Sequence, residues 1–263
     1  MAALIQAAIT RETKAMKHAA RENLKEYAVW DRTTRWFHWI NFAAVSGLAG
    51  IGTVILYANA LGIGDNGKVA LKAVHVLTGY VFCLNLLWRI VWGFIGNRYA
   101  RWAAVLPFGK GYLREAREYL AGFSRGDAPG WLGHNPLGRL MVGVLLVVLL
   151  AMGGTGLILA GTDIYYPPLG GTMKAWVAED QARLGEIKPY SKVNVNEASY
   201  NEMRAFRKPF IRAHETLYYV LLLLIFTHIA AAVVTDVKEK NGIISAMFTG
   251  WKVFDKDPVD REK

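Results

Sequence analysis

Four long apolar stretches constrain the fold of this chain more than any other feature of its sequence. They cover about residues 36–60, 70–96, 137–160 and 210–235. About 20 apolar residues are enough to cross the hydrocarbon core of a membrane as a helix. Backbone groups inside lipid need hydrogen-bond partners within the protein, and a helix supplies them within a single segment. The sequence therefore predicts an all-α fold, a four-transmembrane-helix bundle.

The remaining segments divide the chain into three regions. A basic N-terminal segment, 1–35, precedes the membrane domain, 36–235, and a tail, 236–263, follows it. The membrane domain contains an unusually long loop, 162–208, which is a candidate binding element. Three shorter helices are predicted outside the spans, at KGYLREAREYLAGF, TMKAWVAEDQARLGE and GIISAMFTGWKVF.

The positive charge is unevenly distributed over these regions. The net charge of +10 could indicate nucleic-acid binding. However, nineteen Lys and Arg residues lie in the two terminal segments and the loop 97–136, against eight in the other two loops. Loops rich in Lys and Arg remain in the cytoplasm. This pattern indicates a multi-pass membrane protein in contact with lipid, with both termini cytoplasmic and no nucleic-acid partner.

Four histidines lie within or at the start of the apolar stretches. His214 and His228 share one stretch and are fourteen residues apart, which corresponds to a rise of roughly 21 Å and a rotation within about 40° of the same helix face. His38 and His75 lie near the start of two other stretches. An ionisable side chain within a span is costly, so each is a candidate functional residue.

The predicted topology sorts the four histidines by depth. With the N-terminus inside, His75 and His214 lie near the outer face, and His38 and His228 near the cytoplasmic face. Two pairs of imidazoles at two depths predict two haems, each with two axial histidines and no open position, an arrangement suited to electron transfer. A membrane histidine can also form a helix–helix hydrogen bond or relay protons, so a haem-free transporter is an alternative.

Polar residues near the span ends have two interpretations each. Asn135 precedes Pro136, which fits the cap of the third span, and His134 and Asn135 could also hydrogen-bond a quinone carbonyl. Arginines at span ends can extend toward the lipid headgroups or pair with haem propionates. Arg204, Arg207 and Lys208 crowd the start of the fourth span, where they could face propionates or a partner protein.

Several motifs along the chain resemble one known family. They are RWFHW, HVLTGY, RIVWGFIGNRYAR, GHNPLGRL, the His214/His228 pair and DVKEKNGIISAMFTGWK, and they extend from about Trp30 to Trp251. Together they resemble the b-type cytochrome subunit of membrane-bound nickel–iron hydrogenases. That family belongs to a wider group that includes the cytochrome subunits of formate dehydrogenases and thiosulfate reductases.

The resemblance implies a dihaem cytochrome b in the inner membrane of a bacterium. It implies two haem b groups, with His38, His75, His214 and His228 as their iron ligands. Electrons would pass between a periplasmic redox partner and quinone near the cytoplasmic side, and the chain would also anchor that partner in the membrane. In related subunits the inner ligand and polar residues before the third span help to bind quinone, which implies roles for His228 and Asn135.

The partner is the part of this expectation that the sequence leaves most open. The loop from GTDIYYPPLGG to FRKPFIRAHE is longer and more polar than in the hydrogenase cytochromes it resembles. A periplasmic iron–sulfur or haem subunit is expected, and a multihaem cytochrome c or another dehydrogenase could replace the hydrogenase. A structural anchor that docks an enzyme through this loop, with electron transfer incidental, is a further alternative.

Overall fold

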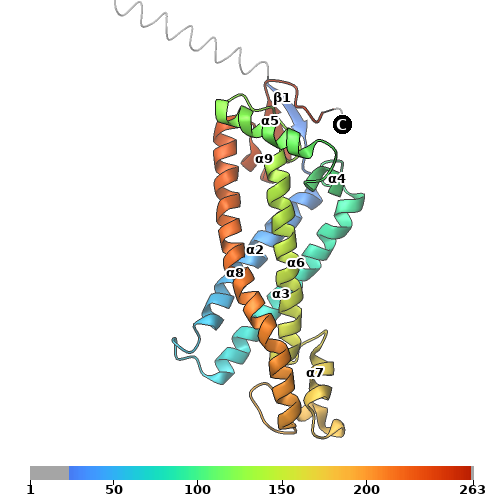
Figure 1. Ribbon diagram of the computed structural model, residues 1–263, viewed down its shortest axis with the longest axis vertical. Coiled ribbons are helices and arrows are strands. Elements are labelled where there is room, and N and C mark those ends of the chain that lie inside the picture. The colour runs from blue at the N-terminus through green and yellow to red at the C-terminus, as the bar shows by residue number, and fades with distance from the viewer. Residues whose placement is uncertain (1–23, 262–263) are drawn as a thin grey trace, which may run out of the picture. The chain divides into compact units, whose positions relative to one another are not determined.

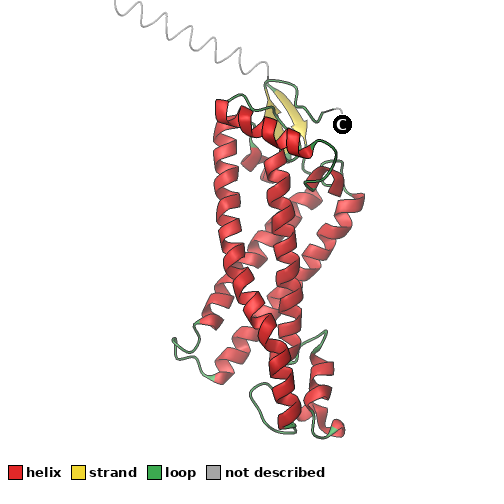
Figure 2. Cartoon of the chain, viewed as in Figure 1, coloured by secondary structure: helices red, strands yellow, loops and turns green. Residues whose placement is uncertain are grey.

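The structure is a computed structural model that describes residues 24–261. Helices account for most of this part of the chain, and one short two-stranded sheet accompanies them (Figure 2). Most of the predicted N-terminal segment, 1–35, lies outside the described residues.

Four helices dominate the described chain. They are α2 (Arg32–Leu56), α3 (Asp65–Ile95), α6 (Pro136–Ile164) and α8 (Glu197–Glu239), labelled in Figure 1. Each is long and apolar enough to cross a membrane. The prediction of an all-α, four-transmembrane-helix bundle is confirmed.

The helices extend beyond the apolar stretches, because polar caps determine where two of them begin. The Asp31 carboxylate accepts a hydrogen bond from the Thr34 amide at 2.6 Å, and α2 starts at Arg32 rather than near residue 36. Asn196 accepts from the Ser199 amide at 3.0 Å, and α8 starts at Glu197 and continues through Pro209. Hydropathy therefore identified the membrane portion of α8 but missed its polar first turns.

The described residues form two compact units, and each of the four long helices contributes to both. Unit 1 comprises residues 24–35, 93–142 and 228–261, and unit 2 comprises residues 36–92 and 143–227. Each unit has a hydrophobic core of its own.

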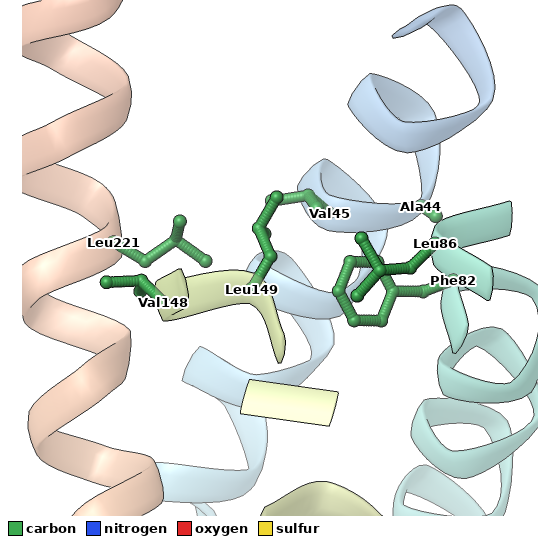
Figure 3. Close-up of a cluster of buried hydrophobic side chains, with 7 residues drawn as sticks. All are labelled: Ala44, Val45, Phe82, Leu86, Val148, Leu149 and Leu221. Carbon is green, nitrogen blue, oxygen red and sulfur yellow. The ribbon is translucent and has the colours of Figure 1, made fainter. Parts of the chain in front are cut away.

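Unit 2 is a helical bundle around an apolar core. Figure 3 shows side chains from all four long helices in this core, with Val45 next to Leu149 and Val148 next to Leu221. Between membrane helices, such side chains stabilise the contact by close van der Waals packing rather than by transfer from water. The buried members are Ala44, Val45, Phe82, Leu86, Val148, Leu149 and Leu221.

The loop between α6 and α8 also belongs to unit 2 and is partly ordered by a second, smaller core. It contains α7 (Gly170–Val177) and the 3-10 helix η1 (Gln181–Glu186). The single helix predicted for TMKAWVAEDQARLGE is wrong, because α7 ends at Val177 and Asp180 caps the next turn by accepting from the Ala182 amide at 2.9 Å. The core consists of Met173, Val177, Ile187 and Met203.

In unit 1, a small sheet joins two segments that are far apart in the sequence. Strand β1 (Lys25–Ala28) pairs antiparallel with β2 (Trp251–Phe254). The helix predicted over 242–254 is therefore only partly correct: α9 (Ile243–Thr249) ends at Gly250, which has a φ of 90°. A Cβ at this glycine would lie 2.6 Å from the Trp30 carbonyl oxygen, so a close backbone approach ends the helix here.

Two further helices of unit 1 lie in the segment between α3 and α6. They are α4 (Trp102–Val105) and α5 (Tyr112–Arg125), and α5 agrees with the helix predicted at KGYLREAREYLAGF. Helix α5 ends at Gly126, whose left-handed backbone is a common helix terminator. The apolar core of this unit consists of Val29, Trp30, Leu132, Ala246 and Phe254.

Candidate functional site

Two histidines that are far apart in the sequence meet inside unit 2. His75 lies on α3 and His214 on α8, and both are half-buried. Their ring centroids are 6.4 Å apart, and the ring planes cross at 77°. The structure thus brings together the pair that the depth argument predicted to lie near the outer face.

A hydrogen bond from α6 orients one of these rings. His214 Nδ1 lies 2.8 Å from the Thr155 hydroxyl oxygen, and that hydroxyl lies 2.8 Å from the Ala151 carbonyl oxygen. Because the carbonyl can only accept, the hydroxyl donates to it and accepts from Nδ1–H. This leaves the other ring nitrogen of His214, Nε2, unprotonated and available as a metal ligand.

Each of the two imidazoles is flanked by a glycine from a neighbouring helix. A Cβ at Gly52 would lie 3.4 Å from His75 Cε1, and one at Gly156 would lie 3.5 Å from His214 Cε1. Any larger side chain at these positions would occupy space beside the rings. Small residues of this kind let a flat group approach a helix backbone closely.

The second predicted pair, His38 and His228, is divided between the two units and stays a prediction. In unit 2, His38 on α2 packs edge-on against Trp39, with ring centroids 5.3 Å apart. The residue before it, Phe37, accepts a hydrogen bond from the Asn85 side chain at 3.0 Å through its backbone carbonyl. In unit 1, His228 lies half-buried on α8.

In unit 1, His134 and Asn135 stand at the start of α6. The His134 ring packs on Trp30, with centroids 4.9 Å apart. The Asn135 side-chain oxygen accepts a hydrogen bond from the Gly138 amide at 2.7 Å. Asn135 therefore caps α6, which was the first of the two interpretations that the sequence offered. Its amide group also donates to the Tyr119 hydroxyl at 2.7 Å.

A cavity of about 460 Å³ lies beside His134 within unit 1. Small-molecule sites commonly have volumes of about 300–1,000 Å³. Arg139 in the wall of this cavity already has hydrogen-bond partners, since it donates to the carbonyl oxygens of Leu106 and Phe108, each at 2.9 Å. The wall also includes Tyr99, Arg101, Tyr112, Trp131 and Asp260.

Comparison with known proteins identifies the family. The family model described as prokaryotic cytochrome b561 matches residues 29–250. The chain belongs to this family. It is therefore a b-type cytochrome, a multi-pass membrane protein that carries electrons and uses b-type haem.

Relatives of this cytochrome share its length. The "Probable Ni/Fe-hydrogenase B-type cytochrome subunit" of Azotobacter vinelandii is 25% identical over 244 residues, which cover 88% of this chain and 90% of the relative. The protein of the same name from Rhizobium leguminosarum bv. viciae is 27% identical over 246 residues, with 88% and 90% covered. No solved structure matches the cytochrome significantly.

The residues at the His75/His214 pair fit b-type haem. A histidine nitrogen lies about 2 Å from a metal ion that it binds, and the centre of its ring lies about 1 Å further away. Two imidazoles on opposite sides of one metal would therefore have ring centres about 6 Å apart. The observed separation of 6.4 Å agrees with this value. Among the described residues, no group of three or more His, Cys, Asp or Glu could hold a metal ion alone. A pair of imidazoles instead suits an iron that a porphyrin already holds.

The tail of the cytochrome holds the 131–133 loop, which leads into His134. The Asp260 carboxylate accepts from the Leu132 amide at 2.7 Å and the Gly133 amide at 2.8 Å. The Lys252 ammonium donates to the carbonyl oxygens of Trp131 at 3.1 Å and Gly133 at 3.0 Å. The tail thus satisfies both donors and acceptors of this loop, a role that no motif in the sequence indicated.

A partly buried hydrogen-bond chain supports Asn135 from another direction. The Tyr119 hydroxyl accepts a hydrogen bond from the Asn135 amide and donates one to the Glu239 carboxylate. Glu239 also accepts a hydrogen bond from Asn241 at 2.8 Å. Burial, followed by the hydrogen bond to Glu239, raises the pKa of Tyr119 well above its usual value. Tyr119 therefore stays a neutral donor at any physiological pH.

Lys252 makes the stability of the cytochrome depend on pH. Burial lowers the pKa of its ammonium from 10.5 to about 8, against the attraction of Asp260, Glu239 and Asp236. Between these pH values the unfolded chain binds more protons than the folded one, so the free energy of unfolding should rise with pH, by at most about 3 kcal/mol. Chemical denaturation of the detergent-solubilised protein at pH 7.5–10.5 measures the rise. The Lys252→Met variant should lack this increment, and an unchanged rise would assign it to other groups.

Proposed function

We propose that this cytochrome transfers electrons between a periplasmic hydrogenase-type partner and the quinone pool of a bacterial inner membrane, and anchors that partner. The names of its full-length relatives support a nickel–iron hydrogenase as the partner. The meeting of His75 and His214 in unit 2 is the observation that carries the proposal.

Four histidines would hold two haem b groups. His75 and His214 form the pair that we assign to the outer face, and His38 and His228 the pair near the cytoplasmic face. Bound haem supplies one-electron exchange between ferric and ferrous iron. Two histidines at each iron leave no open coordination position, which favours electron transfer over oxygen chemistry.

The protein groups around the first pair have defined roles in this proposal. Thr155 fixes the orientation and tautomer of His214, which strengthens its unprotonated nitrogen as a ligand. Gly52 and Gly156 leave room beside the imidazoles. Membership of a cytochrome family, whose members bind haem, disfavours the haem-free transporter.

We assign the quinone site to His134, Asn135 and His228, with His134 at the start of α6 in direct contact and Asn135 in a supporting role next to it. The cavity beside His134 has a suitable volume and mixed aromatic and polar walls. The carbonyl of the Asn135 side chain is taken up by the helix cap, and its amide already donates to Tyr119. His134 is consequently the best-placed polar contact for a quinone oxygen, with Asn135 fixing the backbone next to it.

The orientation in the membrane follows from the charge distribution. The three segments that carry nineteen Lys and Arg residues are assigned to the cytoplasm. The loop between α6 and α8 then faces the periplasm, and its ordered helices, α7 and η1, offer a surface for the partner. The same loop would serve docking and electron entry together.

Purification in detergent with its bound partner tests the proposal. Two haem b per chain by pyridine haemochrome, and reduction of an added quinone by H₂, are the expected results. A colourless protein would refute the electron-transfer role. If H₂ leaves both haems oxidised while another periplasmic donor reduces them, only the hydrogenase as partner would be refuted.

A further inference from the structure

A charge group in unit 2 joins three of its helices and the loop before α8. The Asp163 carboxylate, near the end of α6, accepts hydrogen bonds from Lys72 on α3 and from Arg207 on α8, the latter at 2.8 Å. Lys72 also donates to the hydroxyl of Tyr190, in the loop before α8, at 2.8 Å. The group therefore connects the loop that we assign to partner binding with the helices that carry His75 and His214.

The guanidinium of Arg207 is only partly satisfied within this group. One terminal nitrogen donates to Asp163 and to the Thr162 carbonyl oxygen, the latter at 3.1 Å. The Nε atom is buried and has no hydrogen-bond partner among the described residues. A buried donor on a charged group is costly to leave unpaired, so an acceptor is expected beside this atom.

The charges of the group do not balance. Lys72 and Arg207 carry two positive charges and Asp163 one negative charge. The exposed fractions of these side chains are 20%, 15% and 28%, so water screens them only partly. A further carboxylate would neutralise the excess and accept from Arg207 Nε, because guanidinium groups bind carboxylates through two nitrogens.

Both cations lie on the helix faces of the paired histidines. Lys72 precedes His75 by three residues, a rise of about 4.5 Å, and Arg207 precedes His214 by seven residues, about 10.5 Å. Seven residues complete nearly two turns, so Arg207 and His214 face within about 20° of one another. Since Asp163 contacts both cations, they lie together, toward the starts of α3 and α8.

We propose that Arg207, assisted by Lys72, binds a propionate carboxylate of the haem held by His75 and His214. This inference rests on the proposed function, because it takes those two histidines as axial ligands. Asp163 holds both cations in place and offsets part of their charge. Because Lys72 also binds Tyr190, a protein that moves the loop before α8 would change the electrostatics of this haem.

Redox titration of single-residue variants tests the proposal. A positive charge near a haem favours the reduced form, so Arg207→Gln should lower the midpoint potential of one haem, and Asp163→Asn should raise that of the same haem. Arg204→Gln is the matched control, since Arg204 lies three residues earlier on α8 and is exposed. It should change neither potential.

Two haems with unchanged potentials in Arg207→Gln would overturn the proposal. If that variant instead loses one haem, Arg207→Lys should retain it. If both variants lose the haem and both are also less thermally stable than wild-type protein after haem is removed, Arg207 has a purely structural role. That result would also overturn the proposal.

Haem with esterified propionates separates this proposal from the proposed function. Arg207→Gln protein should lose haem b faster than wild-type protein does, whereas the two proteins should lose haem b dimethyl ester at the same rate, since the ester has no carboxylate for Arg207 to bind. If Arg207→Gln speeds the loss of haem and of its ester equally, that result would contradict the contact with propionate. A wild-type chain that binds no haem would refute the proposed function as well, whereas two haems insensitive to Arg207 would refute only this inference.

Discussion

Replacing His214 with alanine should remove one of the two haem groups that we propose for the cytochrome. The variant removes one of two imidazoles whose ring centroids are 6.4 Å apart, and a single histidine retains a haem far more weakly than a pair. Pyridine haemochrome measures the loss. A redox titration should show one component, whereas we expect two for the wild-type protein.

The pairing itself is tested by combining variants. His75→Ala should remove the same haem as His214→Ala, so the double variant should still retain one, because the two losses are not additive. His134→Ala is the control, since we assign His134 to quinone and not to iron; it should keep both haems while quinone reduction falls. A double variant without haem would mean that His75 and His214 serve different sites.

Replacing Asp260 with alanine should release the 131–133 loop. The change removes a charged acceptor from two buried amides, and each such hydrogen bond is worth about 1.5–3 kcal/mol. A local loss of about 3 kcal/mol would speed hydrogen exchange at the Leu132 and Gly133 amides roughly 100-fold. Exchange followed by mass spectrometry on peptides covering this loop measures the effect, and the apparent KM for quinone should rise with it.

Asp257 offers a matched control within the same tail. Its carboxylate is exposed and pairs with Lys25 at 3.1 Å and Arg261 at 3.0 Å, contacts that contribute little at a surface. Asp257→Ala should leave exchange in the 131–133 loop unchanged. Faster exchange in the Asp260 variant with normal quinone kinetics would show that this loop does not shape the quinone site.

The features that sequence predicted best depend on short-range patterns. Four spans followed from the apolar stretches, including the single helix α8 that carries both His214 and His228. The boundaries were less accurate, because Asp31 and Asn196 begin helices ahead of the apolar residues. The helix predicted at GIISAMFTGWKVF ended early, since its second half pairs as strand β2 with residues more than 200 positions away.

The residues that support the candidate site could not be predicted, because their partners are distant in the sequence. Thr155 looks like an ordinary small residue of an apolar helix, yet it orients His214. Lys252 and Asp260 look like solvated charges of a polar tail, yet they hold the 131–133 loop. Arg207 was noticed among crowded cations, but only the structure reveals the unpaired nitrogen that distinguishes it from Arg204.

The small sheet of unit 1 has a topological consequence. Strand β1 precedes the first span and β2 follows the last, so their pairing requires both ends of the membrane domain to lie on one side of the bilayer. Only an even number of crossings permits this, and four satisfies it. The requirement is independent of the positive-inside argument and holds whichever side is the cytoplasm. An insertion that added a fifth crossing would separate the two strands by the thickness of the membrane.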